Sequence, residues 1–542
     1  MTGNEKSMLK LSFKVIFLGV MTSIFFDCAN RGTASGGEKD VTPPVIIKEE
    51  PENFSTNFSA NEIKIYFDEY IKLKNIQKQL IVSPPMDPEP EITPLSTASK
   101  YITIRIYDTL QPNTTYAFNF GESIEDNNEG NVFPFYRYVF STGSTIDSLS
   151  AKGLVLDALE RENPERISVM LHEIDSTYTD SIIFKQKPKY IGVTDSLSQF
   201  TIENIKEGQY LLTALKEENT NYTYQSKRDK MAYRSTFISV PSDTAYVLKL
   251  FKQQPDFKFV RARQLAKTRI GFGYEGDPSQ MQINLLSKPN DSFTYVIAKA
   301  PKTDTLNYWF KPKKIELDSL RFEVSSPVQN DTVTVRIKNM DSDSLNIQKL
   351  SSTLKLNEQF EFRSNIPLKS VDPTKVKVMN QDSLLLENVL SLDPLDQTKA
   401  SLKFDQEENN NYQITVLPGA FTDFYNTSND TLNVKVNTKL ISSYGDLRLN
   451  IKNANYPLII QLITKNGDVK AEQIAHAPGP VDFIYLEPGN YFLRVIYDTN
   501  NNGQYDPGHF LKKIQPERVS YAEDLIEVRA DWSQIVDFTL ED

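Results

Sequence analysis

Short stretches along the chain alternate between apolar and polar residues. In residues 63–67, 101–106 and 115–120, every second position is apolar. This period of two predicts half-buried β-strands, because successive side chains of a strand point to opposite faces of a sheet. We expect the polar segment 124–131 to be a loop. Short strands separated by turns at this spacing are typical of a β-sandwich, and the first predicted domain spans residues 41–145.

The same pattern continues to the end of the chain. Further strands are predicted at residues 153–158, 199–205, 206–215, 281–285, 294–298, 332–337, 360–362 and 412–417. The chain holds 26 Tyr and 31 Phe against 2 Trp, and such aromatic residues favour strands. We therefore predict an all-β fold, a tandem array of about five β-sandwich domains. Their predicted bounds are 41–145, 146–256, 257–340, 341–440 and 441–542.

Two internal repeats are visible in the sequence. Residues 355–440 repeat the pattern of the first domain, with the alternation of 360–362 in the place of 65–67. Gly489-Asn490-Tyr491 lies 281 positions after Gly208-Gln209-Tyr210. The same offset carries Glu217, Asn219 and Asn221 onto Asp498, Asn500 and Asn502. A shared offset across turn, strand and loop indicates duplication of a two-domain unit.

The beginning of the chain has the layout of a bacterial lipoprotein signal. Lys10 and Lys14 precede an apolar run at residues 15–26, and Cys28 follows. The run is short for a transmembrane helix, so we predict a cleaved signal peptide over residues 1–28 with Cys28 as the lipidated cysteine. Asp27 stands where such signals usually have a small residue, and an ordinary buried cysteine is the alternative. Residues 29–40 are predicted to be a flexible tether.

Composition narrows the possible functions. The net charge of −11 argues against nucleic acid and against electrostatic docking on anionic lipid. Because Cys28 is the only cysteine, no intrachain disulfide can form and each domain must be held by its own core. The three histidines, His172, His476 and His509, leave few candidates for histidine-dependent catalysis or zinc. Sequence motifs for nucleotide binding or a serine nucleophile are missing, so catalysis has no visible site.

Several motifs of the first domain together carry a family resemblance. They are Asp40-x-x-Pro43-Pro44, Phe67-Asp68-Glu69, Leu110-x-Pro112-x-Thr114-x-Tyr116, Ile124-x-Asp126 and Phe140-Ser141-Thr142. This set resembles the bacterial Ig-like domain of S-layer and other surface proteins. The third and fourth domains are expected to be Ig-like as well.

The turn and strand of residues 206–215 resemble the transthyretin-like (carboxypeptidase regulatory-like) domain, a small seven-stranded sandwich, and the fifth domain repeats it. With Cys28 and its tether, the chain resembles a family of Ig-like-domain outer-membrane lipoproteins from Bacteroidota. The resemblance implies a lipid-anchored protein of the outer membrane, exposed at the cell surface or on the periplasmic face.

One loop has the composition of a calcium site. Asp498, Asn500 and Asn502 occupy positions 1, 3 and 5 of an Asp-x-Asn-x-Asn-Gly pattern, Gln504 follows, and Asp506 stands at position 9. Calcium prefers six to eight such hard oxygen ligands. Position 12 is a histidine rather than the usual glutamate, and no flanking helices are predicted. A hairpin turn rich in Asn and Asp is therefore the alternative interpretation.

The segment 133–140 is unusually aromatic. If it is an exposed edge strand, Phe133, Phe135 and Tyr136 are candidate contacts for a partner protein, whereas packing into the core is the alternative. Asp126 and Glu129 are expected to be solvated residues of the neighbouring loop.

Triplets of Asp, Ser or Thr, and an apolar residue recur along the chain. They begin at Asp108, Asp147, Asp195, Asp304, Asp318, Asp382 and Asp430. These triplets resemble the O-glycan acceptor signal of exported Bacteroidota proteins, and turns leading into strands explain them equally well.

Taken together, these features predict a non-enzymatic protein that acts by binding. The resemblance implies a structural or protein-binding subunit of an envelope complex, and the machine that assembles outer-membrane β-barrel proteins is the first candidate. A glycan-binding or adhesive surface lipoprotein is the alternative, against which the scarcity of tryptophan counts.

Overall fold

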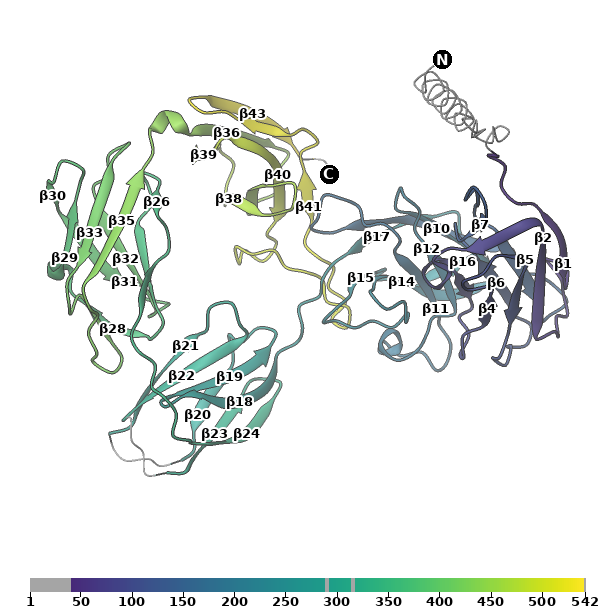
Figure 1. The fold of residues 1–542 in the computed structure, drawn as a ribbon, viewed down its shortest axis with the longest axis horizontal. Coiled ribbons are helices and arrows are strands. Elements are labelled where there is room, and N and C mark those ends of the chain that lie inside the picture. The colour runs from purple at the N-terminus through teal and green to yellow at the C-terminus, as the bar shows by residue number, and fades with distance from the viewer. Residues whose placement is uncertain (1–39, 288–291, 313–316, 541–542) are drawn as a thin grey trace, which may run out of the picture. The chain divides into compact units, whose positions relative to one another are not determined.

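The structure, a computed structural model, describes residues 40–287, 292–312 and 317–540. Nearly all of its regular structure is β-strand (Figure 1), so the predicted all-β fold is confirmed. The helical segments in this part of the chain are short: α2 (Ile76–Gln79), η1 (Ile182–Phe184), η2 (Pro373–Lys375) and η3 (Ile441–Ser443). The described residues divide into two compact units, the first within residues 40–82 and 86–146 and the second within residues 83–85 and 147–540.

The first unit is built from two sheets around one apolar core. One sheet has the strand order β4-β5-β2-β7-β8, with β1 beside β2, and the other has the order β3-β6-β9. Phe67, Phe118 and Phe140 are almost fully buried between them. The strands are β1 (Ile46–Glu50), β2 (Glu62–Leu73), β3 (Ile81–Ser83), β4 (Glu91–Thr93), β5 (Ser99–Arg105), β6 (Thr115–Asn119), β7 (Ile124–Asp126), β8 (Val132–Phe133) and β9 (Arg137–Ser141).

Strand β2 continues beyond the predicted residues 63–67 to Leu73. After a register shift between Tyr66 and Ile71 it still pairs with β5 at Ile71, and on its other edge its last residues pair with β7. One expectation for this unit was wrong. The predicted loop 124–131 begins with that strand, β7, and Ile124 is fully buried. Three residues are too few for an alternating pattern to be recognised in the sequence.

The second core lies between a sheet of order β13-β10-β17 and one of order β12-β11-β14-β15, with β16 also paired to β14. Strand β17 runs parallel to β10. The strands are β10 (Leu149–Asp157), β11 (Ser168–Glu173), β12 (Tyr190–Val193), β13 (Gln199–Ile205), β14 (Gly208–Lys216), β15 (Lys230–Tyr233), β16 (Ile238–Val240) and β17 (Ala245–Leu250).

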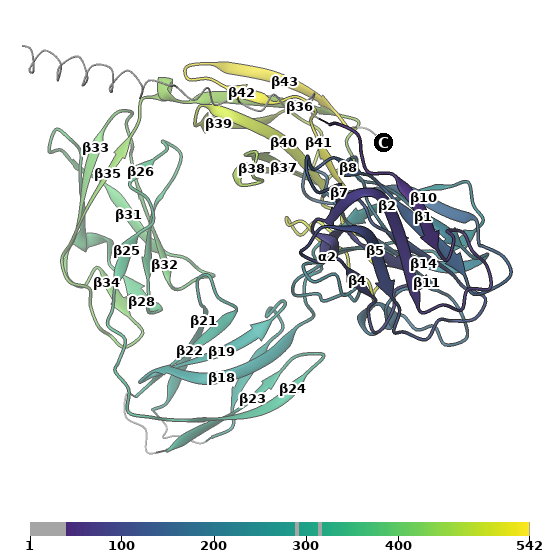
Figure 2. The ribbon, with the colours of Figure 1, turned by 45° about the vertical axis from the view of Figure 1, so that its right-hand side comes forward.

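The third core lies between a sheet of order β18-β19-β22-β21 and one of order β20-β23-β24 (Figure 2). The sequence predicted β20, β21 and β24 here but not the other four strands. The strands are β18 (Lys258–Ala266), β19 (Arg269–Glu275), β20 (Gln282–Leu285), β21 (Thr294–Lys299), β22 (Thr305–Lys311), β23 (Ser319–Ser325) and β24 (Asn330–Arg336).

The fourth core lies between sheets of order β25-β27-β32-β31 and β26-β35-β33-β29-β30, and β28 pairs with β34. The strands are β25 (Ile347–Lys349), β26 (Thr353–Leu354), β27 (Phe360–Ser364), β28 (Leu368–Val371), β29 (Val376–Met379), β30 (Leu385–Leu386), β31 (Asn388–Leu392), β32 (Lys399–Phe404), β33 (Asn411–Val416), β34 (Phe421–Asp423) and β35 (Leu432–Thr438).

The fifth core repeats the sheet order of the second. One sheet is β39-β36-β43, with β43 parallel to β36, and the other is β38-β37-β40-β41, with β42 paired to β40. The strands are β36 (Gly445–Lys452), β37 (Leu458–Ile463), β38 (Val469–Ala475), β39 (Val481–Leu486), β40 (Gly489–Tyr497), β41 (Val519–Tyr521), β42 (Ile526–Val528) and β43 (Ser533–Thr539).

Hydrogen bonds of single tyrosines show how closely these cores repeat. The hydroxyl of Tyr210 donates to the carbonyl of Lys206 at 2.8 Å, and that of Tyr491 donates to the carbonyl of Glu487 at 2.7 Å. Both residues of the second pair lie 281 positions after those of the first. The offset noticed in the sequence therefore carries a side-chain contact as well as strand order.

The first and fourth cores share a different tyrosine contact. The hydroxyl of Tyr116 accepts the backbone N–H of Gln111 at 2.9 Å, and that of Tyr412 accepts the N–H of Glu407 at 2.6 Å. Here both residues of the second pair lie 296 positions after those of the first. Each bond fastens a strand to the turn before it, as the tyrosine corner of Ig-type sandwiches does.

These two corners make a matched prediction. Replacing Tyr116 or Tyr412 by phenylalanine removes the oxygen that accepts the turn's N–H, and we expect each change to lower the free energy of unfolding by about 1 kcal/mol. Urea unfolding followed by tyrosine fluorescence measures the effect. Tyr107→Phe is the control, because its hydroxyl donates only to Glu91 on an exposed surface. Equal effects at Tyr107 and Tyr116 would contradict a special role for the corner.

Candidate functional site

The predicted lipidation site, Cys28, lies outside the described residues, as do the signal peptide and all but the last residue of the predicted tether. Within the described part of the chain, no helix is both long and apolar enough to cross a membrane. Attachment through Cys28 remains a prediction.

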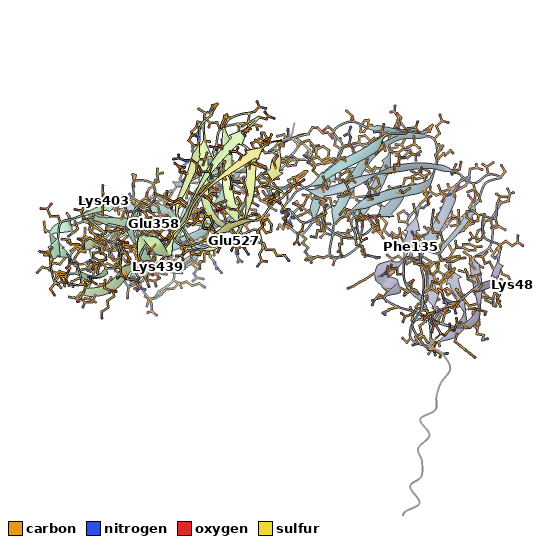
Figure 3. The ribbon with its side chains drawn as sticks, turned by 90° about the horizontal axis from the view of Figure 1, so that it is seen from above. Lys48, Phe135, Glu358, Lys403, Lys439 and Glu527 are labelled. Carbon is orange, nitrogen blue, oxygen red and sulfur yellow. The ribbon has the colours of Figure 1, made fainter. Side chains whose placement is uncertain are left out.

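The structure separates the three aromatic candidates for partner binding. Phe135 is 67% exposed, whereas Tyr136 is only 9% exposed. The ring of Phe133 packs edge-on against Phe67, with centroids 6.4 Å apart, and lies 5.9 Å from the ring of Tyr136. Of the three, Phe135 presents its ring to solvent (Figure 3), while the other two contribute to the core.

The aromatic segment is therefore two strands joined by a turn rather than one continuous strand. Strand β8 ends at Phe133 and β9 begins at Arg137, and the two belong to different sheets. Pro134 has no N–H to offer to a sheet ladder, which favours a break at this point. Phe135 has a φ of 58°, and its N–H donates to the carbonyl of Gly121 at 2.7 Å.

The side chain of Tyr136 is held by a hydrogen bond to Glu49. Its hydroxyl donates to the carboxylate of Glu49, and burial together with this hydrogen bond raises its pKa. The hydroxyl of Tyr138 likewise donates to the carbonyl of Pro51 at 2.7 Å. These bonds hold two tyrosines that follow Phe135 in the chain.

Asp126 corrects the expectation of a solvated loop residue. Its side chain is 1% exposed, and its two oxygens accept the backbone N–H groups of Asn128, Glu129, Gly130 and Asn131 at 2.6–3.2 Å. Burial alone would raise the pKa of this carboxyl, but these hydrogen bonds outweigh it and the pKa is lowered. Asp126 therefore organises the turn between β7 and β8.

The predicted calcium loop follows β40 and contains the expected residues in one turn. Asp498 is fully buried, and its carboxylate accepts the N–H of Asn502 at 3.0 Å and that of Gly503 at 2.8 Å. The side-chain amide of Asn502 donates to the carboxylate of Asp506 at 2.9 Å, and Asn500 also donates to it. The side chain of Gln504 is exposed.

A third acid, Glu517, contacts this loop, and the sequence pattern missed it. Glu517 is 8% exposed, and one of its oxygens accepts the N–H of Thr499 at 2.7 Å while the other accepts the N–H of Asp506 at 3.0 Å. It lies beyond the 12-residue window of the pattern because a hairpin, residues 507–516, intervenes. A search for the next acid after the insertion would have found it.

The counterpart of this loop in the second core has the same backbone shape. Tyr222 donates its N–H to Glu217 at 2.9 Å, as Gly503 does to Asp498, and both donors have a positive φ. The loop shape is thus common to both copies, which supports the turn interpretation. The described residues contain no group of three or more His, Cys, Asp or Glu side chains arranged to hold a metal ion.

Calcium binding at the Asp498 loop therefore remains a prediction, with a direct test. Asp498→Ala removes a buried acceptor of two N–H groups and is expected to lower the free energy of unfolding by about 2 kcal/mol. If the loop binds calcium, millimolar Ca²⁺ raises the melting temperature of the natural protein and leaves that of the variant unchanged. If Ca²⁺ does not change the melting temperature of the natural protein, the loop is a structural turn and calcium binding is rejected.

The three histidines lie in different parts of the second unit. His172 is 1% exposed, neither of its ring nitrogens has a hydrogen-bond partner among the described residues, and burial lowers its pKa to about 4. His509 contacts Asp256 at 3.1 Å, and His476 is exposed immediately after the end of β38. His172 lies in β11, His476 follows β38, and His509 lies in the loop between β40 and β41.

The second unit also contains a cavity of about 790 Å³, lined by residues of its second, third and fifth cores. Lys230 lies in its wall and contacts Asp157 at 2.7 Å and Glu160 at 2.6 Å. Burial would lower the pKa of Lys230, but these contacts raise it. The wall thus carries both acids and lysines.

The Asp-Ser/Thr triplets stand at turns and strand starts. The hydroxyl-bearing residue is exposed in five of them, at Thr109, Ser148, Ser196, Ser383 and Thr431, and half-buried in the other two. This placement agrees with both interpretations given above, so glycosylation stays a prediction.

Comparison with known proteins identifies the first domain. Residues 40–142 match the family model described as "Bacterial Ig-like domain", which confirms the expectation for this region and covers about a fifth of the chain. No curated protein sequence matches the chain.

Several solved structures of surface proteins are similar to the chain at low identity. Domains 1–6 of the surface layer protein SbsC are 12% identical, with a TM-score of 0.15, over 90% of this chain and 68% of that one. The major pilin subunit BcpA of Bacillus cereus is 12% identical, with a TM-score of 0.12, over 73% and 99%. The BSP domain of a biofilm-associated protein is 9% identical, with a TM-score of 0.14, over 75% and 99%.

Proposed function

We propose that this protein is a non-enzymatic, lipid-anchored protein of the bacterial envelope that acts by binding another protein through its first domain. The observation that carries the proposal is the exposed turn at Phe135. A large aromatic side chain with a positive φ is unfavourable for the backbone, and its exposure is unfavourable for the ring. A residue held in such a conformation is a candidate for a functional role.

The surroundings of Phe135 are suited to presenting one side chain. The Phe135 N–H is bonded to Gly121, and the flanking Tyr136 is fixed by Glu49. A rigid aromatic side chain loses little conformational entropy when it is buried by a partner, and such residues dominate the binding energy of many interfaces. The turn therefore offers a small preorganised anchor on a sandwich scaffold.

The finer form of the proposal names an outer-membrane lipoprotein of the Bacteroidota type, anchored through Cys28. In this form the protein is a subunit of an envelope complex, with the machine that assembles outer-membrane β-barrel proteins as the first candidate. The match of residues 40–142 to the bacterial Ig-like domain supports an extracytoplasmic role. The signal-like sequence before Cys28 supports the anchor.

Glycan binding is the weaker alternative. Sugar-stacking sites need exposed aromatic faces, and Trp309 is 2% exposed in the third core. Trp532 is 55% exposed, but Arg529 lies 5.5 Å over its ring. A glycan array without binding would remove this alternative.

Co-purification from native membranes in mild detergent tests the proposal. The tagged natural protein is expected to bring down a stoichiometric integral outer-membrane partner, and Phe135→Ala is expected to lose most of it. Phe54→Ala is the matched control, because Phe54 is also exposed, at 61%, and has a φ of 60° in the same unit. Isolation of the natural protein alone contradicts the binding role, and full retention by Phe135→Ala contradicts the site.

A further inference from the structure

The fifth core carries a hairpin that reaches into the second core. Residues 507–516, between the Asp498 loop and β41, fold back on themselves, with His509 and Ile514 exchanging both backbone hydrogen bonds at 2.8 and 3.0 Å. Phe510 stands at the turn of this hairpin and is fully buried. Figure 1 shows this yellow segment beside β15 of the second core.

Phe510 is buried by aromatic residues of the second core. Its ring meets that of Tyr233 edge-on, with centroids 5.1 Å apart, and the ring of Phe184 lies 6.3 Å away. Its backbone N–H donates to the side-chain carbonyl of Gln253 at 3.0 Å. Gly508 passes so close to Phe251 that a Cβ there would lie 2.7 Å from the ring. We call these four residues of the second core the socket: Phe184, Tyr233, Phe251 and Gln253.

Polar contacts surround the buried ring. His509 and Lys512 both contact the carboxylate of Asp256, at 3.1 and 3.2 Å, and Lys513 contacts Asp180 at 2.7 Å. Asp256 and Lys512 are each 60% exposed at the side chain, so these ion pairs are open to water and to screening by salt. The hairpin is thus held by one buried apolar residue, Phe510, which we call the plug. The surrounding polar contacts of His509, Lys512 and Lys513 form what we call the rim.

The hairpin is present in only one of the two copies of the repeated domain. In the second core, the loop runs from Glu217 to β15, which begins at Lys230. In the fifth core, the equivalent loop runs from Asp498 to β41, which begins at Val519 and is eight residues farther along. The extra length is taken up by the hairpin. One copy of the repeated domain therefore carries the plug, and the other copy provides the socket.

A second contact links the same two cores. The carbonyl of Leu159 accepts a hydrogen bond from Arg494 at 3.3 Å and another from Tyr521. The guanidinium of Arg161 lies 4.3 Å over the ring of Phe492. Contacts between residues more than 300 positions apart bring the end of the chain back to the second core, beyond what the linkers through the third and fourth cores require.

We propose that the hairpin of residues 507–516 is a releasable latch that fastens the fifth core to the second. With Phe510 in the socket, the hairpin and the contacts of Leu159 and Arg161 together hold the fifth core against the second. Withdrawal of Phe510 exposes the aromatic socket and leaves only the contacts of Leu159 and Arg161 to be broken before the fifth core is free on its linkers. Each core keeps its own sheets and apolar interior, so opening does not require any of them to unfold. The proposal stands independently of the binding role given above.

Hydrogen exchange on the full chain, with Phe510→Ala against Leu511→Ala, tests the latch. Leu511 is 47% exposed beside Phe510 in the same hairpin, so its truncation controls for local damage. Phe510→Ala is expected to speed exchange of the His509 and Ile514 amides by about tenfold or more, with no change at the amides of β40. Small-angle scattering is expected to show a larger radius of gyration for this variant, while Leu511→Ala matches the natural protein.

The alternatives are distinguishable. Unchanged exchange and an unchanged radius in Phe510→Ala would show that the plug does not hold the cores together, and the latch would be rejected. Faster exchange at β40 as well would show that the hairpin is part of the fifth core's own fold, which also rejects it. Raising the salt concentration should lower hairpin protection in the natural protein, since the rim is exposed.

Discussion

Replacing Asp126 by alanine is expected to destabilise the first unit by about 4 kcal/mol, the largest single effect that we predict. The carboxylate accepts four backbone N–H groups, and hydrogen bonds to a charged group are stronger than those between neutral groups. Alanine leaves these donors without their acceptor in a turn that joins β7 to β8. Urea unfolding of the full chain should show the unfolding transition of the first unit moving to a lower urea concentration.

Asp126→Asn provides a graded control. Its remaining oxygen can replace the one that accepts from Asn128, Glu129 and Gly130, but its amide cannot accept the N–H of Asn131. We expect a loss of about 1–2 kcal/mol. Asp68→Ala should have little effect, because Asp68 is exposed and accepts only the N–H of Val45 among the hydrogen bonds described for its side chain. Equal losses for Asp126→Ala and Asp68→Ala would contradict the account of the turn.

Acid is expected to destabilise the second core through His172. Burial lowers the pKa of His172 to about 4, whereas an unfolded histidine titrates near 6.5. Above pH 6.5 the ring is neutral in both states and has no effect. As the pH falls from 6.5 toward 4, the unfolded state takes up the proton first, so stability is lost over this window. The full difference amounts to about 3 kcal/mol.

The comparison that isolates this effect is His172→Leu against the natural protein. The difference in unfolding free energy between pH 7.5 and pH 4.5 should shrink in the variant, because leucine does not titrate. His476→Gln, at an exposed position, should leave the pH dependence unchanged. A variant with the natural pH dependence would show that the acid sensitivity arises elsewhere, for example from carboxylates.

The sequence predicted the class of fold well, because alternation and turns are local signals. Residues 63–67, 101–106 and 115–120 lie in or overlap β2, β5 and β6. Strands could not be recognised in the sequence where the segment was too short to alternate or was apolar at nearly every position. Strand β7 has three residues, and β37 is buried at every position, so neither alternates between apolar and polar side chains. The continuous aromatic segment 133–140 concealed the turn at Phe135.

The site residues were predictable only where a motif is local. The Asp498 loop was found from its spacing, but Glu517 was missed because an inserted hairpin separates it from that loop. Nothing near Phe510 in the sequence points to Tyr233, which lies 277 positions earlier. Contacts of this kind form between domains that have already folded. They leave no local pattern of apolar and polar residues from which they could be predicted. The two internal repeats were the long-range signals available in the sequence, and neither of them points to this contact.

In the proposed function, acyl chains on Cys28 hold this array of β-domains in the envelope, where the protein acts by contact. Mass spectrometry of the mature protein from fractionated native cells tests this proposal. We expect a membrane-bound chain whose first residue is Cys28, carrying a diacylglyceryl group. A cytosolic chain that begins at Met1 or Met8 with an unmodified Cys28 thiol would contradict it.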